Sequence, residues 1–225
     1  MCRSIIPFDV TDLGPLFVAS FKHGNMIVAD RRTRTWFQQA SFQSLIGPLH
    51  PRELEMVSYQ MLSWRELRES GEVPPFAAFT EADLRDFELP IPGLWKKILA
   101  SEATPGLSRA KHDTSLPART HVIGLLEPGM PPLAVEREAV RRAGTLRLDE
   151  VDVVLVSAGG GVTGYHRDGR ELRLEEGELR DATGARWSLR GKALAGQGDL
   201  RRVALSDEYW FSWKLFHPSA RLIRV

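Results

Sequence analysis

Cysteine and long apolar runs are what this sequence has least of. Cys2 is the single cysteine among 225 residues, which excludes an intramolecular disulfide and a metal cage built from cysteines, and leaves the redox compartment open. The longest apolar stretches, 13–19 and 151–158, are far shorter than the roughly 18 to 20 residues of a membrane span. We therefore expect a soluble chain without a transmembrane segment.

An excess of charge of either sign is also missing. The chain has 30 Lys and Arg against 29 Asp and Glu, a net charge of +1, and its paired arginines stand among acidic residues. A surface that binds a nucleic-acid backbone gathers its basic residues on one face. The composition therefore argues against a nucleic-acid partner.

The first residues do not have the character of a secretory signal. Residues 1–4 lack the basic start, apolar centre and small-residue cleavage site of such a segment, and a strand-like stretch begins at Ile5. We expect that the chain opens part-way through a folded element. The length suits one large domain or two small ones that need no disulfide.

An internal repeat is the clearest pattern in the sequence. An Asp is followed after five residues by a Trp in two places, and a Gly precedes a Ser-Trp pair at the same spacing in two places. We interpret this as two copies of one module. The repeated positions are Asp30, Trp36, Gly47 and Trp64 in the first copy, and Asp181, Trp187, Gly196 and Trp213 in the second.

The repeat predicts the domain organisation. We expect a first module over residues 1–71, a proline-rich connector with apolar residues that dock it over 72–120, and a second module over 121–225. The predicted fold class is α+β and β-rich, with two related β-hairpin modules that are each closed by a Trp-bearing helix. Residues 16–21 and 26–29 are expected to form a hairpin around His23-Gly24-Asn25.

Three helices are predicted from apolar spacing and capping residues. Ser58 is the expected N-cap of a helix that ends at Gly71, residues 133–142 are expected to be helical, and Ser206 is the expected N-cap of the last helix. In that last helix Trp210 and Trp213 share an aromatic face, which is more typical of core packing than of a ligand-stacking surface.

The two repeated aspartates have a structural and a catalytic interpretation. An Asp at the first position of a turn accepts a hydrogen bond from the backbone two residues on. This role explains Asp30 and Asp181 better than catalysis does.

Residues Gly159 to Gly164 match the glycine pattern of a dinucleotide-binding loop. That loop needs a helix directly after it, whereas the following residues alternate and turn as in a hairpin. A tight β connection is therefore the favoured interpretation, and nucleotide binding is the third functional alternative.

Few residues are candidates for chemistry. Cys2 is a candidate reactive thiol beside Arg3, or else a small structural residue. The six histidines include no pair at the i, i+4 spacing of a helical metal site, and no G-x-S-x-G motif is present. We predict no metal, no cofactor and no catalytic set, although a triad of residues remote in sequence stays open.

A resemblance to a known family rests on seven segments, which are Cys2 to Asp9, Asn25 to Gln39, Gly47 to Leu49, Leu62 to Trp64, Leu116 to Gly124, Asp181 to Trp187, and Trp210 to Pro218. Through these segments, over nearly its whole length except the connector, the chain resembles the bacterial DUF3179 family of uncharacterised proteins. Relative to the family, the first cysteine of a Cys-Pro-Leu-Cys-like pair would precede Met1, so the chain is truncated or has lost it, and Gly159 falls where Cys2 falls in the first copy. The resemblance implies an architecture without a reaction, and export signals in the family hint at an extracytoplasmic location.

Two functions follow as expectations. The first is a non-catalytic binding or interaction scaffold, because no catalytic set is visible. The alternative is a thiol- or metal-dependent activity centred on Cys2 and a partner cysteine missing upstream.

Overall fold

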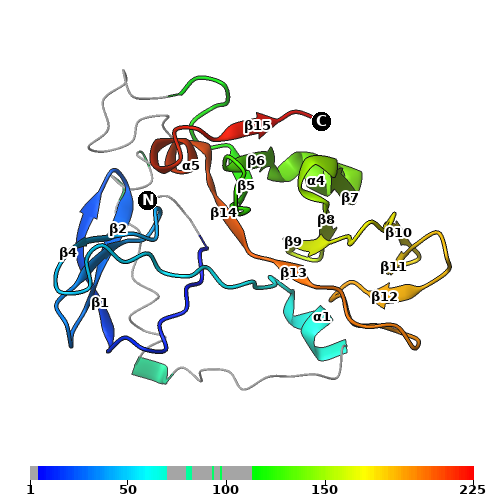
Figure 1. Cartoon of the computed structure of the whole chain (residues 1–225), viewed down its shortest axis with the longest axis horizontal. Coiled ribbons are helices and arrows are strands. Elements are labelled where there is room, and N and C mark those ends of the chain that lie inside the picture. The colour runs from blue at the N-terminus through cyan, green and yellow to red at the C-terminus, as the bar shows by residue number, and fades with distance from the viewer. Residues whose placement is uncertain (1–4, 70–79, 83–92, 94–96, 98–112) are drawn as a thin grey trace.

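The computed structural model of the chain describes residues 5–69, 80–82, 93, 97 and 113–225. Strands dominate these residues, and the helices are few and short. The predicted β-rich character is confirmed, and the strands of the described residues form four sheets. Figure 1 shows the first sheet at one end of the molecule and the other sheets beyond it.

The first sheet is an antiparallel meander in the order β1-β2-β3-β4. The predicted hairpin is confirmed, since β1 pairs with β2 and His23 and Gly24 take the positive φ values of 53° and 78° that this tight turn requires. One face covers a core around Phe37, Phe42 and Leu54. The strands are β1 (Leu16–Lys22), β2 (Asn25–Asp30), β3 (Trp36–Gln38) and β4 (Ser44–Ile46).

The central sheet has the order β14-β5-β6-β15 and buries both of its faces. One face shares the largest core, which contains Ile123 and Leu125. The other face holds Val122 against Trp213 and Trp210. The strands are β5 (His121–Leu125), β6 (Leu133–Glu136), β14 (Leu205–Tyr209) and β15 (Arg221–Ile223), of which β15 runs parallel to β6.

A third sheet, in the order β13-β9-β8-β7, packs on the first of these faces. Its strand β8 is buried along most of its length, as its run of valines predicts. Helix α4 (Arg137–Ala143) follows β6 directly. The remaining elements are β7 (Thr145–Leu148), η2 (Asp149–Val151), β8 (Val153–Ala158), β9 (Gly161–His166) and β13 (Arg202–Val203).

The fourth sheet is a small meander of β10 (Arg173–Glu175), β11 (Glu178–Arg180) and β12 (Arg186–Ser188). It packs on the outer face of the third sheet, where Trp187 joins a core with Val154 and other residues.

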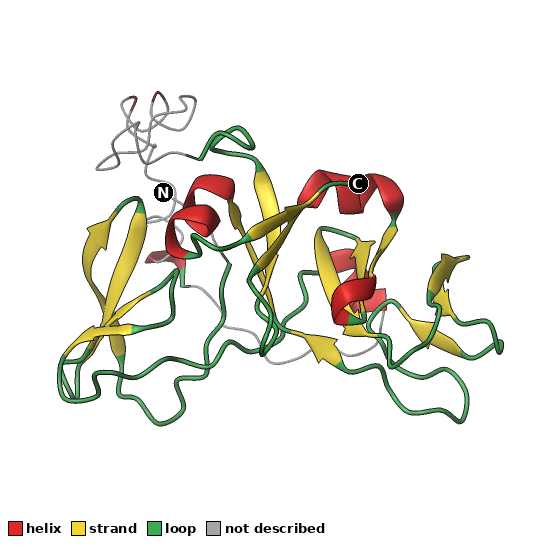
Figure 2. Ribbon diagram, turned by 45° about the horizontal axis from the view of Figure 1, so that its top comes forward, coloured by secondary structure: helices red, strands yellow, loops and turns green. Residues whose placement is uncertain are grey.

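Helix α5 (Trp210–Phe216) lies between the first sheet and the central sheet (Figures 1 and 2). Its Trp213 ring fills the space above Gly124 of β5, and the ring of His217, just after the helix, lies 6.3 Å from the ring of Phe42. The helix ends at Phe216, as the following His-Pro pair predicts. None of the described helices is long and apolar enough to cross a membrane.

The predicted start of the first helix at Ser58 is wrong. Helix α1 spans Trp64–Glu69, and Gly71 lies outside the described residues. The Gln60 side chain donates a hydrogen bond to the hydroxyl of Tyr165, and Met61 packs against Gly161. These long-range contacts with β9 hold the segment before α1 outside a helix, which local spacing does not reveal.

Two other helix predictions need correction. Residues 133–136 form β6, because this segment pairs with β5 on one side and with β15 on the other. Ser206 lies inside β14 rather than at a helix start, and its hydroxyl donates to Glu208 over 2.7 Å. Strand pairing overrides local helix signals at both places.

Candidate functional site

Polar side chains gather where β5 begins, at one end of the central sheet. His121 is paired with Tyr209, and Ile123 is paired with Asp207. Because side chains alternate along a strand, these positions project from the same face. Arg137 follows Glu136, the partner of Val122, which places it beside His121.

Asp207 holds the imidazole of His121. The Nδ1 atom of His121 lies 3.3 Å from Oδ1 of Asp207, and the Asp207 side chain is 5 % exposed whereas that of His121 is 31 % exposed. The ring of His121 also lies 4.5 Å from that of Tyr209. A buried carboxylate at Nδ1 fixes the orientation of the ring and leaves Nε2 available on the other side.

Arg137 brings a positive charge to the same carboxylate. Its Nε lies 3.4 Å from Oδ2 of Asp207, and its Nη2 donates to the carbonyl oxygen of Gly160 over 2.7 Å. Within the described part of the chain, the buried Nε atom makes no hydrogen bond. The guanidinium is therefore anchored at one end and still has donor capacity in the site.

Two further segments border this cluster. Ile5 pairs with Asp207 through the backbone, with its N–H donating to the Asp207 carbonyl over 3.0 Å. Burial raises the pKa of Tyr59 above its ordinary value, and the charge of Asp207 raises it further while Arg137 lowers it. Tyr59 is therefore a neutral hydroxyl near these charges at physiological pH.

The arrangement is suited to binding an oxyanion. Arg137 supplies N–H donors and a fixed charge, and the Nε2 atom of His121, which is not the atom that contacts Asp207, is a second polar group that would add a positive charge if the ring were protonated. Asp207 neutralises one of these charges and fixes the imidazole. An imidazole held by a carboxylate is also able to accept a proton, provided that a reacting group is bound beside it.

A buried carboxyl group, Glu208, lies on the opposite face of β14. It is fully buried, and its Oε1 accepts a hydrogen bond from the Ser206 hydroxyl. Burial raises the pKa of Glu208 to about 7, against the opposing hydrogen bond from Ser206. Because it faces away from His121, we treat it as a feature of the core.

The two repeated aspartates accept hydrogen bonds within their turns. Asp30 accepts from the hydroxyl and N–H of Thr33 and from the N–H groups of Arg32 and Gly14. Asp181 accepts from the hydroxyl and N–H of Thr183 and from the N–H of Ala185. Hydrogen bonds from Thr33 and Thr183 are the largest causes that lower the pKa values of Asp30 and Asp181, respectively.

The repeated tryptophans and glycines differ between the two copies. Trp36 is 38 % exposed and Trp187 is 1 % exposed. Trp64 is 57 % exposed at the first residue of α1, whereas Trp213 and Trp210 are buried in α5. The same holds for the glycines, since Gly47 packs tightly on Thr35 and Gly196 has open space around it.

The glycine motif lies in a hairpin. Residues 159 and 160 connect β8 to β9, and Ala158 pairs with Gly161. Gly161 begins a strand rather than the helix that a dinucleotide-binding loop needs. Cys2 lies outside the described residues, so the thiol interpretation remains a prediction.

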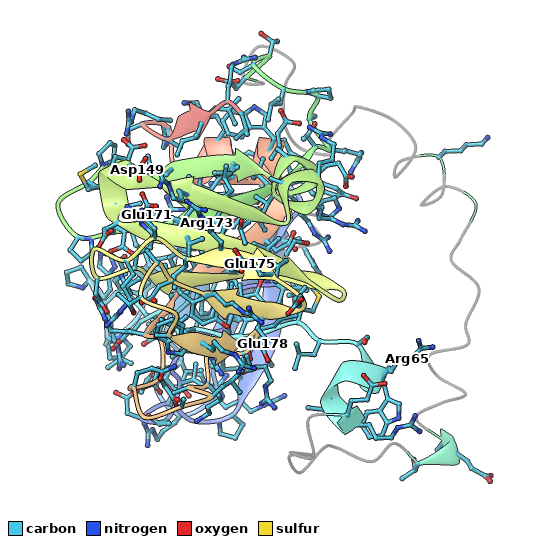
Figure 3. All side chains as sticks on the ribbon, turned by 90° about the vertical axis from the view of Figure 1, so that its right-hand side faces the viewer. Arg65, Asp149, Glu171, Arg173, Glu175 and Glu178 are labelled. Carbon is cyan, nitrogen blue, oxygen red and sulfur yellow. The ribbon has the colours of Figure 1, made fainter. Side chains whose placement is uncertain are left out.

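A charged stripe on the fourth sheet and its surroundings is a weaker candidate. Figure 3 shows Asp149, Glu171, Arg173, Glu175 and Glu178 along one face of the molecule. The acidic residues of the stripe form ion pairs with arginines, such as the pair of Glu171 with Arg173. Exposed ion pairs of this kind contribute little to stability. It is a solvated surface of mixed sign.

Sequence reasoning did not single out the cluster at His121. Its members come from three separate places in the chain, and 86 residues separate His121 from Asp207. A signal that was available is the acidic pair Asp207-Glu208 inside a strand with aromatic neighbours, since acids are rarely buried there without a partner. Among the described residues, no group of His, Cys, Asp and Glu is arranged to hold a metal ion.

The chain was compared with known proteins at the level of families, curated proteins and solved structures. The model of the family described as "Protein of unknown function (DUF3179)" matches residues 1–220, which agrees with the resemblance seen in the sequence. The comparisons with curated proteins and with solved structures found no match.

Proposed function

This chain belongs to the DUF3179 family of proteins of unknown function, and we propose that it is a non-catalytic binding module for a small oxyanion, a carboxylate or a phosphate. The observation that carries the proposal is the contact of Asp207 with both His121 and Arg137. Both side chains are partly exposed and lie beside one buried carboxylate. The site therefore combines fixed donors with a net positive charge when His121 is protonated.

Binding of simple oxyanions tests this proposal. Malonate and inorganic phosphate are titrated into the protein by calorimetry, and we expect saturable binding that Arg137→Gln weakens at least tenfold and that 0.5 M NaCl also weakens. Arg173→Gln is the matched control, because Arg173 is an exposed arginine on β10, away from the site. Thermal unfolding of each variant shows whether it is folded.

Three results would refute oxyanion binding at this site. The first is the absence of saturable binding to folded wild-type protein. The second is equal affinity in Arg137→Gln and Arg173→Gln. The third is binding that is lost in the control variant as well. If Arg137→Gln does not fold, His121→Asn serves as the second variant and is expected to weaken binding, because the imidazole held by Asp207 is missing.

We also propose that the scaffold arose by duplication of one module. The support is that Asp30 and Asp181 start the turns before β3 and β12 and accept similar hydrogen bonds, with Thr33 and Thr183 as donors. Trp36 and Trp187 then lie in the strand that follows each turn. The boundaries of the two modules and the connector at 1–71, 72–120 and 121–225 remain predictions.

A thiol activity centred on Cys2 is the second candidate function. The observation that favours it is the pairing of Ile5 with Asp207, because Cys2 precedes Ile5 by three positions in the sequence. If His121 activates this thiol, alkylation by iodoacetamide should titrate below the ordinary thiol pKa of about 8.5. His121→Asn should restore an ordinary titration. An ordinary titration in the wild type would exclude this candidate.

A further inference from the structure

A groove lies between the first sheet region and the far end of the central sheet. Its volume is about 460 Å³, which falls within the range of pockets that hold small molecules. The floor is apolar and the rim carries two glutamates. The lining residues are Phe42, Glu53, Leu54, Glu55, Met56, Leu126, Pro128 and Ala204.

The groove is separate from the oxyanion site. Leu126 follows the last residue of β5, and Ala204 precedes the first residue of β14, whereas His121 stands at the opposite end of β5. A strand rises about 3.3 Å per residue, so the five residues of β5 separate the two places by roughly 16 Å.

Backbone hydrogen bonds fix the segment that carries the two glutamates. The N–H of Leu54 donates to the Phe42 carbonyl over 2.8 Å, and the carbonyl of Glu55 accepts from the N–H of Asp9 over 2.8 Å. Leu54 is 3 % exposed, and it anchors the segment in the core of the first sheet. The groove is therefore shaped by ordered backbone rather than by surface side chains alone.

Glu53 and Glu55 are exposed carboxylates without a cationic partner among the described residues. This separates them from the acids of the charged stripe, where Glu178 is paired with Arg186 and Glu171 with Arg147. Two unpaired negative charges above an apolar floor form a surface that is complementary to a cation with an apolar body.

We propose that this groove binds a small organic cation, an ammonium group that carries an apolar body. The ammonium group lies against Glu53 and Glu55, and the apolar body covers Leu126 and Met56. Neither the ammonium group nor the apolar body is expected to give high affinity alone. An exposed ion pair contributes little binding free energy, and a small apolar body buries little area in an open groove.

Phenethylamine and phenethyl alcohol separate the two contributions, since they share one apolar body and differ in charge. The two compounds are titrated into the full chain and followed by ¹H–¹⁵N NMR. We expect saturable shifts at residues 53–56 and at Leu126 with phenethylamine, and roughly fivefold weaker binding of the alcohol. The double variant Glu53→Gln/Glu55→Gln should weaken phenethylamine binding at least fivefold.

Glu171→Gln/Glu175→Gln is the control, because it removes two exposed acids far from the groove and leaves the net charge equal to that of the test variant. Equal affinity of the amine and the alcohol would overturn the proposal, as would equal loss in the test and control variants. Saturable shifts confined to other surfaces would overturn it too. The exposed positions of the four glutamates allow every variant to fold, which thermal unfolding verifies.

Discussion

The hydroxyl of Ser212 in α5 donates a hydrogen bond to Oδ1 of Asn25 in β2 over 3.2 Å, although 187 residues separate them in the chain. Both side chains are fully buried. The neighbouring Glu208 is also fully buried, and burial raises the pKa of its carboxyl group to about 7. The first sheet is therefore joined to the central sheet at a buried polar contact beside a titratable carboxyl group.

Glu208 should make stability depend on pH. Its pKa is about 7 in the folded protein against an ordinary 4.5, so the folded state binds the proton more tightly than the unfolded state. This stabilisation is fully present below pH 4.5 and is lost as the pH rises to about 7. Between those pH values the free energy of unfolding of the wild type should fall by roughly 3 kcal/mol relative to that of Glu208→Gln, measured by urea unfolding.

The buried His217 makes stability depend on pH in the direction opposite to Glu208, so the comparison must cancel its contribution. Burial lowers its pKa to about 4 from an ordinary 6.5. Its contribution to the stability of the folded state is therefore fully present above pH 6.5 and is lost as the pH falls through 4. Because both proteins retain His217, its contribution cancels in the difference between them. A difference that stays constant from pH 4.5 to 7 would show that Glu208 does not titrate as described.

The two strand tryptophans should differ in their contribution to stability. Trp187 is 1 % exposed and donates a hydrogen bond from Nε1 to the Gly198 carbonyl, so Trp187→Ala should cost about 3 to 5 kcal/mol. Trp36 is 38 % exposed, so Trp36→Ala should cost about 1 to 2 kcal/mol. Denaturant unfolding measures both. Equal losses in the free energy of unfolding would contradict the difference in burial between Trp36 and Trp187.

Gly124 is needed for the packing of α5 on the central sheet. A Cβ atom at this position would lie 2.4 Å from Cζ3 of Trp213, and a buried indole ring has no space to move. Gly124→Ala should therefore destabilise the protein by about 1 to 3 kcal/mol. Gly160→Ala is the control, since nothing lies within 4 Å of its Cβ position. Similar unfolding midpoints for the two variants would contradict this packing.

The turn between β1 and β2 could be predicted from the sequence, whereas the strand pairing at 133–136 could not. The His23-Gly24 turn predicts the β1–β2 hairpin because the backbone needs positive φ there, and that information is local. The segment at 133–136 was expected to be helical. It forms a strand instead because it pairs with β5 on one side and with β15 on the other. The strand β15 is far from this segment in the sequence, so local residue patterns do not reveal the pairing.

The candidate site was hidden for a related reason. His121, Arg137 and Asp207 carry no motif, and only the register of three strands brings them to one end of a sheet. The repeat indicated where turns form, and it did not indicate which tryptophan is buried, because Trp36 and Trp187 have the same local sequence role and different neighbours in space.

The side chain of His121 provides the most direct test of the proposed oxyanion site. Long-range ¹H–¹⁵N spectra of the six histidines are recorded while malonate is added at constant pH and ionic strength. The contact with Asp207 predicts that neutral His121 carries its proton on Nδ1, and that its Nε2 signal shifts and saturates while the other histidines stay in place. An unmoved His121 signal at saturating malonate would contradict oxyanion binding at this site.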